Sequence, residues 1–511
     1  MDRDGTLMVV TDLSICFGAA LLDRDAGTQT WHRMEKDLFL HTGDQQAWLQ
    51  LEQKQAAELT SGELVIKSIW VGTPPLSPEA YGQWEGRPGN IWLLRNQYRG
   101  DLQTVVTSID VLFGTDAVDP RPGWSLVHSP LALDAPPEVP IAKITVRHGT
   151  PRASPDAPDT PLRAGRDGKF KIVQISDTHM VTGPGMCKDA SNAEGQPLPE
   201  SEADPLTVEF LENVLEVEHP DLVILTGDQL HHDLLDSQTT LFKVVTPMID
   251  RSIPFAVVFG NHDDEGIHAL SRNAQMQILE TLPFNLAHAS PADIDGVSNY
   301  YIQILGTAPS SSPMATLFFI DSHGQVPSEV HNPDYKPIQS TQIAWFTEKS
   351  QTLRKAREKH HNPKHVSLAF QHIPLPEFAD ASLITVAGHR REPTEGPSVN
   401  THFYDALVGE GVVALGCGHD HVNDFCGSLP GNQDDTLNSE KTSQPGPWLC
   451  YGGGSGFGGY MSYGPNRYHR RSRVWELDAK TGGVTTWKRV EYASERVDEL
   501  VLVVGGEGVP P

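Results

Sequence analysis

The sequence predicts an α/β protein in which a β-rich N-terminal domain precedes an open α/β sheet. Residues 1–150 consist of short runs of alternating apolar and polar residues, separated by turn-rich pieces. From residue 169 onward the pattern changes to strand, loop and helix in turn. Several of these later strands run directly into Asp, Asn or His. A chain of 511 residues has room for roughly two to four such domains.

The N-terminal domain is expected over residues 1–150. Runs such as ELVIKSIWVG and VTSIDVLFG alternate with the period of a half-buried strand, and TPPLSPEAYG and VDPRPGW mark turns between them. Residues 151–168 are rich in Pro, Gly and charge, so we predict a linker there.

The second domain is expected over residues 169–495, followed by a tail at 496–511. Its strands are predicted at KIVQI, DLVILT, IPFAVVF, ATLFFIDS, HVSLAF and GVVALGC, and its clearest helices at DPLTVEFLENVLEVE and TQIAWFTEKSQTLRKAREK. The runs WLCYGGG, RVWELD and VTTWKRVEY predict a C-terminal extension of further strands.

Polar side chains follow five of the predicted strands at the point where each strand ends. The residues are Asp177, His179, Asp228, Asn261, His262, Asp263, His372, His419 and His421. Because ligands of an open α/β sheet bind outside the carboxyl ends of its strands, we expect these side chains to converge although they are far apart in sequence.

This set of side chains is typical of a metal site. It contains carboxylates, an amide oxygen and several imidazoles but no thiolate, and such ligands suit Fe, Mn or Zn. There are more candidate ligands than one ion needs. Two ions about 3.5–4 Å apart, sharing one bridging carboxylate, would account for the surplus.

The series D-x-H, G-D, G-N-H-D, H and G-H-D-H resembles the calcineurin-like metallophosphoesterase superfamily, in the family order and over residues 169–425. The resemblance implies an α/β sandwich that holds two divalent or mixed-valence metal ions. It implies that Asp177, His179 and His421 bind the first ion and that Asp228 bridges. It also implies that the ligands of the second ion are Asn261, His372 and His419.

The same resemblance implies roles for two residues that do not bind metal. His262 is similar to the histidine that steadies the phosphoryl group or protonates the leaving oxygen, and Asp263 would hold His262 in the right tautomer. A hydroxide bridging the two cations would attack phosphorus in line.

A narrower resemblance is carried by CGHDHVNDFCG and WLCYGGGSGFGGY. These blocks are similar to the fungal cell-cycle-regulator-type phosphatases and the plant probable inactive purple acid phosphatases. Purple enzymes carry a Tyr three residues after the bridging Asp, where this chain has His231. We therefore expect a colourless protein without an obligate ferric site. The ligands that the calcineurin-like resemblance implies are all present, so the residues do not support the word inactive.

The sequence thus predicts a phosphatase that hydrolyses phosphomonoesters, and the narrower resemblance suggests phosphoproteins as substrates. A phosphodiesterase with the same site is the first alternative, because a wider pocket would admit two substituents. The second alternative is a binding or scaffold protein with a silent metal site, in which residues 1–150 recognise a partner.

Composition excludes some classes of partner. The formal charge of −27 argues against nucleic acid as a partner, and no apolar run reaches the ~18 residues of a membrane span. The N-terminus begins with acidic residues and is not expected to be a signal peptide. Five scattered cysteines predict reduced thiols and a cytoplasmic or nuclear location, with Cys417 and Cys426 buried.

Some other features allow two interpretations. The segments 231–233 and 389–391 could contact substrate or lie on solvated loops. The run GGGSGFGG lacks the Lys-Ser/Thr of a phosphate-binding loop, so we predict a tight loop near the site.

Overall fold

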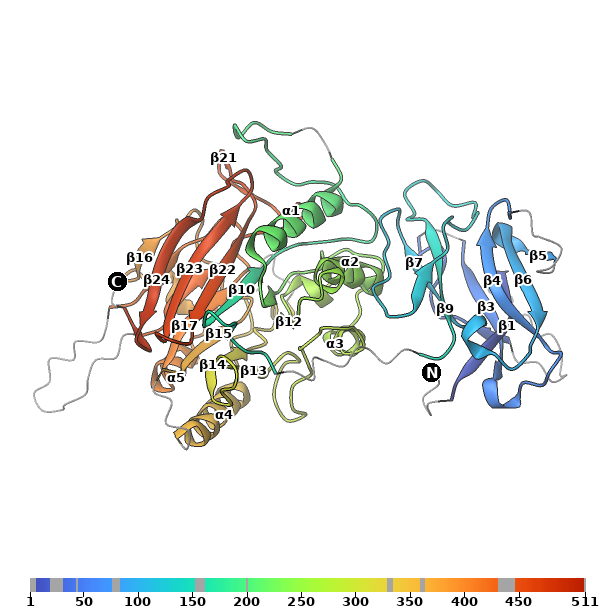
Figure 1. Cartoon of the computed structure of the whole chain (residues 1–511). Helices are drawn as coiled ribbons and strands as arrows, with labels where there is room; N and C mark the ends of the chain where they lie inside the picture. The colour runs from blue at the N-terminus through green and yellow to red at the C-terminus, as the bar shows by residue number, and fades with distance from the viewer. Residues whose placement is uncertain are drawn as a thin grey trace, which may run out of the picture. The chain divides into compact units, whose positions relative to one another are not determined.

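The computed structural model (Figure 1) describes residues 6–18, 31–42, 45–75, 83–151, 161–198, 201–328, 334–358, 364–430 and 446–509. The chain divides into two compact units. The first comprises Met1–Pro155 with Thr182–Pro184 and Gln238–Thr246, and the second comprises Asp156–Val181, Gly185–Ser237 and Pro247–Pro511. Residues 152–160 of the predicted linker lie outside the described residues, so the domain boundaries stay a prediction.

The first unit contains three antiparallel sheets of three strands each, in the orders β1-β3-β2, β4-β6-β5 and β7-β9-β8. The strands are β1 (Met8–Phe17), β2 (Trp31–Arg33), β3 (Ala47–Gln55), β4 (Leu64–Val71), β5 (Trp84–Arg87), β6 (Ile91–Gln97), β7 (Val106–Phe113), β8 (Trp124–Leu126) and β9 (Ala142–His148). Alternate apolar side chains of these strands face inward, and Val9, Val65 and Val105 form one fully buried cluster. The predicted β-rich N-terminal region is therefore confirmed.

The second unit is built on two seven-stranded sheets. In order, the first sheet consists of β12 (Phe255–Val258), β11 (Leu222–Thr226), β10 (Lys169–Ile175), β22 (Arg471–Asp478), β23 (Gly483–Val490), β24 (Val497–Val504) and β25 (Glu507–Gly508). The second consists of β13 (Tyr300–Leu305), β14 (Pro313–Phe319), β15 (Val366–Phe370), β17 (Val412–Cys417), β19 (Trp448–Tyr451), β18 (Cys426–Ser428) and β16 (Ile384–Ala387). A hairpin of β20 (Ser462–Tyr463) and β21 (Asn466–Arg467) completes the strands.

Buried side chains join the two sheets face to face. Phe370 of β15 meets the indole of Trp475 of β22 edge-on, with ring centroids 5.7 Å apart. Between them, the side-chain amide of Gln174 donates to the carbonyl of Cys417 and accepts from the Trp475 indole, both at 3.1 Å. The buried amide is thus satisfied from both sheets, which sets how they stack.

Helices cover the outer faces of both sheets (Figure 1). The helix α1 (Ala203–Glu218) lies on the first sheet, where the Trp487 indole of β23 donates to Glu218 at 2.8 Å. The helices α4 (Ser340–Glu358) and α5 (Phe403–Gly409) pack on the second sheet through Phe346, Phe403 and Leu407. The remaining helices are α2 (Ser237–Asp250) and α3 (Arg272–Leu279). This α/β sandwich confirms the predicted fold class.

The prediction of a tail at 496–511 is wrong for most of its length. Residues 497–504 form β24, which pairs antiparallel with β23 and β25. The run VDELVLVV alternates as a strand should, and Leu502 and Val503 are fully buried. The sheet continues here because the edge of β23 offers unpaired backbone groups to a matching run.

The prediction of a reduced Cys426 is also wrong, because Cys426 forms a disulfide with Cys450. These two residues face each other across the antiparallel pair β18 and β19. The pairing of Cys426 with Cys450 depends on the register of β18 and β19, which the spacing of the cysteines in the sequence does not reveal. Cys417 is a buried free thiol, as predicted.

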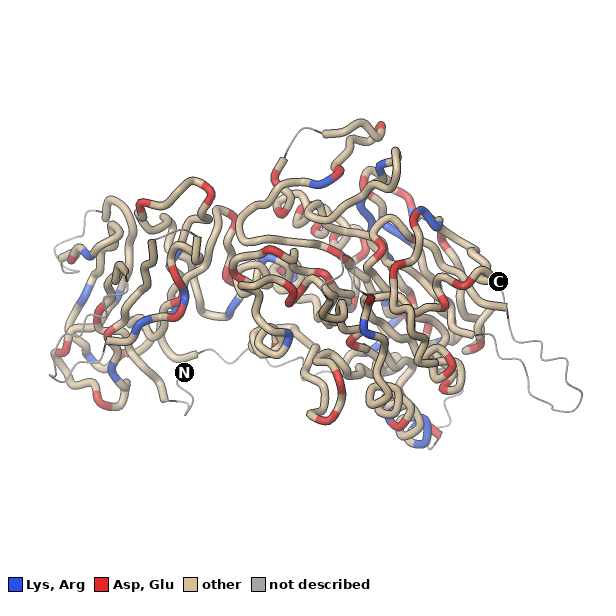
Figure 2. The backbone as a smooth tube through the Cα atoms, turned by 180° about the vertical axis from the view of Figure 1, so that it is seen from behind, with Lys and Arg blue, Asp and Glu red and all other residues tan. Residues whose placement is uncertain are grey.

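Two further features of the described residues concern partners. No helix combines the length and apolar character that a membrane span requires. Acidic positions are distributed over both units (Figure 2), in keeping with the formal charge of −27.

Candidate metal centre

The topology of the second unit brings the predicted ligands together. β10, β11 and β12 run parallel, as do β14, β15 and β17, so their carboxyl ends reach the same edge of the sandwich. The loops after β10, β11, β12, β15 and β17 carry the polar residues that the sequence singled out. The candidate ligands therefore lie close together because their strands end at the same edge, although they are far apart in sequence.

One group of three residues consists of Asp177, His179 and His421, each with a ligand atom within 4.8 Å of the others. The Nε2 atoms of His179 and His421 lie 3.0 Å apart, and Nε2 of His421 lies 3.5 Å from Oδ1 of Asp177. All three side chains are buried. This is the set that the family resemblance implies for the first ion.

A second group consists of Asp228, His372 and His419, with the same limit of 4.8 Å between ligand atoms. Nε2 of His372 lies 3.3 Å from Nδ1 of His419 and 3.2 Å from Oδ1 of Asn261. Asn261 thereby joins the group and completes the set implied for the second ion.

Asp228 stands between the two groups. Its Oδ2 lies 3.1 Å from Nε2 of His372 and 3.7 Å from Nε2 of His179. Its Oδ1 accepts the backbone N–H of His262 at 2.8 Å, which fixes the plane of the carboxylate. The position suits a ligand shared by two ions, as the sequence predicts.

The backbone is strained where it presents the ligands. Asp177, His179, Asp228 and His419 have φ values of 56°, 46°, 50° and 78°, in the left-handed region that residues other than glycine rarely adopt. Such strain costs on the order of 1–3 kcal/mol per residue and clusters where function requires it. Four of the seven proposed ligands share this feature.

The hydrogen bonds of the imidazoles leave nitrogen lone pairs facing inward. The Nδ1–H of His372 donates to the carbonyl of Thr226, and that of His421 donates to the carbonyl of Tyr460, both at 2.8 Å. In the neutral form of each ring Nε2 is therefore the atom without a proton, and it is the atom that can bind a cation. Nε2 of His419 is buried and has no hydrogen-bond partner among the described residues. The donor set and its tautomers fit divalent metal ions.

The pKa values report how the charges of the cluster balance. Burial lowers the pKa of His179 and His419 well below the ordinary value. Burial also disfavours a charged His372, but the neighbouring carboxylate of Asp228 outweighs it and raises the pKa of His372 to about 9. Burial raises the pKa of Asp177 to about 7, and the charge of Asp228 adds to the effect. A carboxylate cluster this deeply buried requires compensating positive charge.

The expected partner of His262 is corrected by the structure. Asp263 accepts the backbone N–H groups of Gly260, Asp228 and Leu230, at 2.6, 3.1 and 2.9 Å, and so holds the backbone of two ligand loops. Nδ1 of His262 lies instead 2.5 Å from Oε2 of Glu265. His262 begins a single 3₁₀ turn, η5 (His262–Asp264), which brings residues three apart onto one side. The i, i+3 spacing of His262 and Glu265 in the run HDDE could have indicated this pairing from the sequence.

The glycine-rich segment lies against the cluster, which confirms the predicted tight loop near the site. A Cβ atom added at Gly456 would clash with the carbonyl of Thr178, and one added at Gly458 would clash with the carbonyl of His179. At Gly459 a Cβ atom would lie 2.5 Å from Cε1 of His421 and 2.8 Å from Cδ2 of His179. Only glycine lets this backbone pass so close to two ligand rings.

The structure gives different roles to the segments 389–391 and 231–233, which the sequence allowed either to contact substrate or to lie on solvated loops. Arg391 pairs with Asp424 at 2.7 Å and Arg390 donates to the carbonyl of Phe378 at 2.7 Å, so both hold loops together. His231 is buried, and its ring meets that of His179 edge-on at 5.6 Å. Of these two segments, it is therefore the one around His231 that contacts the metal centre.

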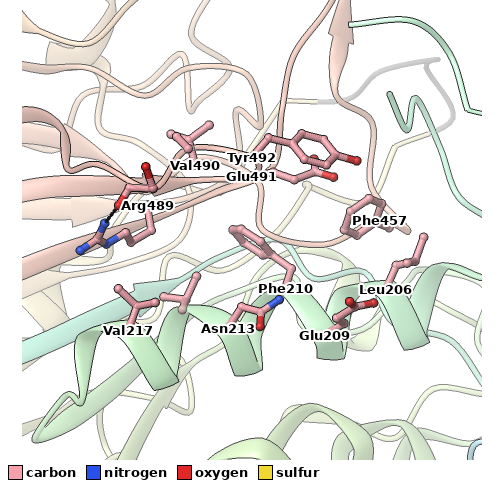
Figure 3. Close-up of a pocket in the computed structure, with 13 residues that line it drawn as sticks. Leu206, Glu209, Phe210, Asn213, Val217, Phe457, Arg489, Val490, Glu491 and Tyr492 are labelled. Atoms are coloured by element: carbon pink, nitrogen blue, oxygen red, sulfur yellow. Dashed lines mark hydrogen bonds between the residues drawn. The ribbon is translucent and has the colours of Figure 1, made fainter. Parts of the chain in front are cut away.

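Two pockets accompany the site. A polar pocket of about 370 Å³ is lined by the proposed ligand Asn261 and by Asp264, Glu265, Arg272 and His323, among others. A mainly apolar pocket of about 400 Å³ lies between α1 and the end of β23 (Figure 3). Of the predicted ligands, Asn261 lines the polar pocket and none lines the apolar pocket.

Comparisons with known proteins give one family model and several similar proteins. The family model described as calcineurin-like phosphoesterase matches residues 170–423. Phosphatase DCR2 of Saccharomyces cerevisiae is 33% identical over 419 residues, covering 79% of this chain and 68% of that protein. Probable inactive purple acid phosphatase 29 of Arabidopsis thaliana is 35% identical over 356 residues, covering 65% of this chain and 84% of that protein. A solved dimetal phosphatase of Danio rerio, 12% identical with a TM-score of 0.39, covers 66% of this chain and 99% of its own.

The resemblance carried by the strand-end motifs is therefore confirmed, together with the narrower fungal and plant subgroup. The matched residues include every loop that carries a proposed ligand. The chain belongs to the calcineurin-like phosphoesterase family.

Proposed function

We propose that this protein is a dinuclear metal-dependent phosphatase that hydrolyses phosphomonoesters, with phosphoproteins as its substrate class. The observation that carries the proposal is the meeting of two buried ligand groups at Asp228, whose carboxylate lies 3.7 Å from His179 and 3.1 Å from His372. A site of this kind suits the displacement of a leaving group from phosphorus.

Two divalent or mixed-valence ions of Mn, Fe or Zn would be held by Asp177, His179, Asp228, Asn261, His372, His419 and His421. When bound, such ions supply an activated water as nucleophile and positive charge beside the phosphoryl oxygens. The chain's part is to fix the ligand tautomers through Thr226 and Tyr460 and to exclude water by burial.

His262 is positioned to move a proton to the leaving oxygen. Its Nδ1 is taken by Glu265, so Nε2 is the atom that can face substrate. Burial disfavours its charged form, but the carboxylates of Asp228 and Glu265 outweigh burial and raise its pKa. A raised pKa extends to higher pH the range in which the imidazole is protonated, as a general acid requires.

The polar pocket beside Asn261 and Glu265 gives the leaving group a place on the His262 side of the cluster. Its volume of about 370 Å³ lies in the range of pockets that bind small ligands. The formal charge of −27 supports a monoester over a nucleic acid diester.

The test measures metal content and turnover on one purified batch, using para-nitrophenyl phosphate against bis-para-nitrophenyl phosphate. We expect about two metal ions per chain and faster turnover of the monoester. Asp228→Asn removes the shared ligand and is expected to abolish turnover with loss of metal. Asp293→Asn, an exposed position, is the matched control.

Faster turnover of the diester would replace the proposal with a phosphodiesterase. Two bound ions with turnover of neither ester would favour the binding or scaffold alternative. Survival of metal content and turnover in Asp228→Asn would show that the bridging assignment is wrong.

A further inference from the structure

Lys188 places an ammonium group beside the metal centre. Its Nζ donates to Nε2 of His231 at 2.8 Å, while its side chain remains exposed. Within the described part of the chain, no carboxylate forms an ion pair with Lys188, whereas Arg272 and Arg391 pair with Asp321 and Asp424. The charge of Lys188 is therefore available to an anion.

The backbone around Lys188 is held in place from two sides. Its N–H donates to the carbonyl of Phe457, within the glycine-rich loop that contacts the ligand rings, at 2.8 Å. Its own carbonyl accepts from the guanidinium of Arg470, which is almost fully buried. Lys188 is thus presented by an ordered loop rather than by a free surface segment.

The partner ring of Lys188 is also fixed. An ammonium group can only donate, so Nε2 of His231 accepts from Lys188 and the proton of the neutral ring is on Nδ1. Nδ1 lies 2.7 Å from Oδ1 of Asp233, although not in hydrogen-bond geometry. The backbone N–H of His231 donates to the carbonyl of Met180 at 2.9 Å. The ring then meets His179 of the first ligand group edge-on at 5.6 Å. Asp233, His231 and Lys188 form a relay of contacts that ends at the first ligand group.

The charge of the substrate decides what an ammonium can do there. A phosphomonoester carries about −1.5 to −2 at neutral pH, whereas each phosphodiester carries a single negative charge. A cation beside the phosphoryl group therefore stabilises the bound monoester more than the bound diester. A charge-assisted hydrogen bond also outweighs a neutral one.

We propose that Lys188 is a specificity-determining residue that binds a phosphoryl oxygen next to the first ligand group and selects monoesters over diesters. His231 acts as a positioning residue that holds the ammonium over that group. The inference rests on the proposed phosphatase function and identifies a residue of the chain that selects the substrate.

The experiment compares Lys188→Met and Lys188→Arg with the unaltered protein. Lys355→Met, at an exposed position in the last turn of α4, is the matched control. We measure kcat/KM for para-nitrophenyl phosphate and bis-para-nitrophenyl phosphate, metal content, and the Kd of inorganic phosphate for the metal-loaded protein by calorimetry.

Lys188→Met is expected to lower kcat/KM for the monoester by roughly 10–100-fold, the size of a lost hydrogen bond to a charged group. The diester should change several-fold less, the Kd of phosphate should rise by a similar factor to the monoester loss, and metal content should stay the same. Lys188→Arg should restore most of the monoester activity, because it keeps the charge.

Equal losses on both esters, or an unchanged Kd of phosphate, would overturn the inference. Loss of metal in Lys188→Met would also overturn it, because Lys188 would then support the ligands and not the substrate. A wild-type protein that prefers the diester contradicts the proposed function instead. If the wild-type protein turns over neither ester, the Kd of phosphate alone decides about Lys188.

Discussion

At the scale of single residues, the pair His262 and Glu265 shows how the chain controls a proton. Glu265 lies 2.5 Å from Nδ1 of His262, and its carboxylate helps to raise the pKa of that ring. Asp263, which the sequence favoured as the partner, is turned into the backbone and holds Gly260, Asp228 and Leu230. The acid and the residue that orients it are therefore three positions apart.

His262→Ala is expected to lower kcat by about 10²–10⁴-fold, the range of general acid catalysis, with metal content nearly unchanged. Metal analysis and steady-state kinetics on the same batch check this. A variant that loses its metal would identify His262 as a ligand.

Glu265→Gln is expected to move the alkaline limb of the kcat/KM profile toward lower pH by about one pH unit, since an opposite charge is lost from His262. The sign follows because an acid with a raised pKa stays protonated to higher pH, and activity falls as pH rises through that pKa. An Asp293→Asn profile is the control, because Asp293 is exposed and does not line the polar pocket. Profiles that coincide with that of the wild type would contradict the assignment.

The residue at position 231 decides the colour of the protein. His231 stands where purple enzymes carry their tyrosine ligand. The tyrosines that contact the ligand rings are Tyr335, edge-on to His419, and Tyr460, stacked on His421. Burial raises the pKa of both phenols, which keeps them protonated. We expect the iron-loaded protein to show no purple absorption band, which a visible spectrum checks.

At the scale of elements, the glycine-rich loop after β19 packs directly against the candidate ligand rings. Gly459→Ala is expected to lower metal content and thermal stability, because the new Cβ would lie 2.5 Å from His421 and 2.8 Å from His179. Metal analysis and thermal melts check this. Gly409→Ala, at the end of α5 with open space around its Cβ position, is the control and should change neither. Normal metal binding by Gly459→Ala would show that the loop can shift to accommodate a Cβ atom, and would contradict this prediction.

One of the C-terminal strands, β24, was not predicted from the sequence. β22 and β23 were predicted because RVWELD and VTTWKRVEY alternate, but the equally regular VDELVLVV was assigned to a tail. Burial of Leu502 and Val503 depends on the edge of β23, which lies next to β24 only in the folded sheet. The same holds for Cys426 and Cys450, which become neighbours through strand pairing.

At the scale of the whole molecule, metal binding and folding are linked through His372. In the metal-free protein its pKa is raised to about 9, mainly by Asp228 acting against burial, from an ordinary value of 6.5. Folding therefore takes up a proton, and this stabilisation is fully present below about pH 6.5. It is lost as the pH rises toward 9.

We expect the melting temperature of chelator-treated protein to fall between pH 7 and pH 9, and expect added metal to remove that trend, because a bound ion takes over the charge. Thermal melts with EDTA and with added Mn²⁺ or Zn²⁺ check both statements. His372→Gln should lack the trend. A metal-free protein that is equally stable at pH 7 and pH 9 would contradict the charge balance described above.

The family, the α/β class and the set of ligands proposed for the site could be predicted from the residues alone, because each of these depends on local pattern. A buried strand followed at once by Asp, Asn or His can be recognised from a few residues, and five such motifs in order are specific. The domain that precedes them was recognisable as β-rich for the same reason.

Which side chains meet could not be predicted from local pattern and became visible in the folded chain. Glu265 on His262, Lys188 on His231, Gly459 on two ligand rings and the Cys426–Cys450 disulfide all depend on distances between segments. The strain at Asp177, His179, Asp228 and His419 is likewise a property of the folded backbone. Local pattern fixes the type of each element, whereas contacts across the chain are set by how the sheets and loops pack.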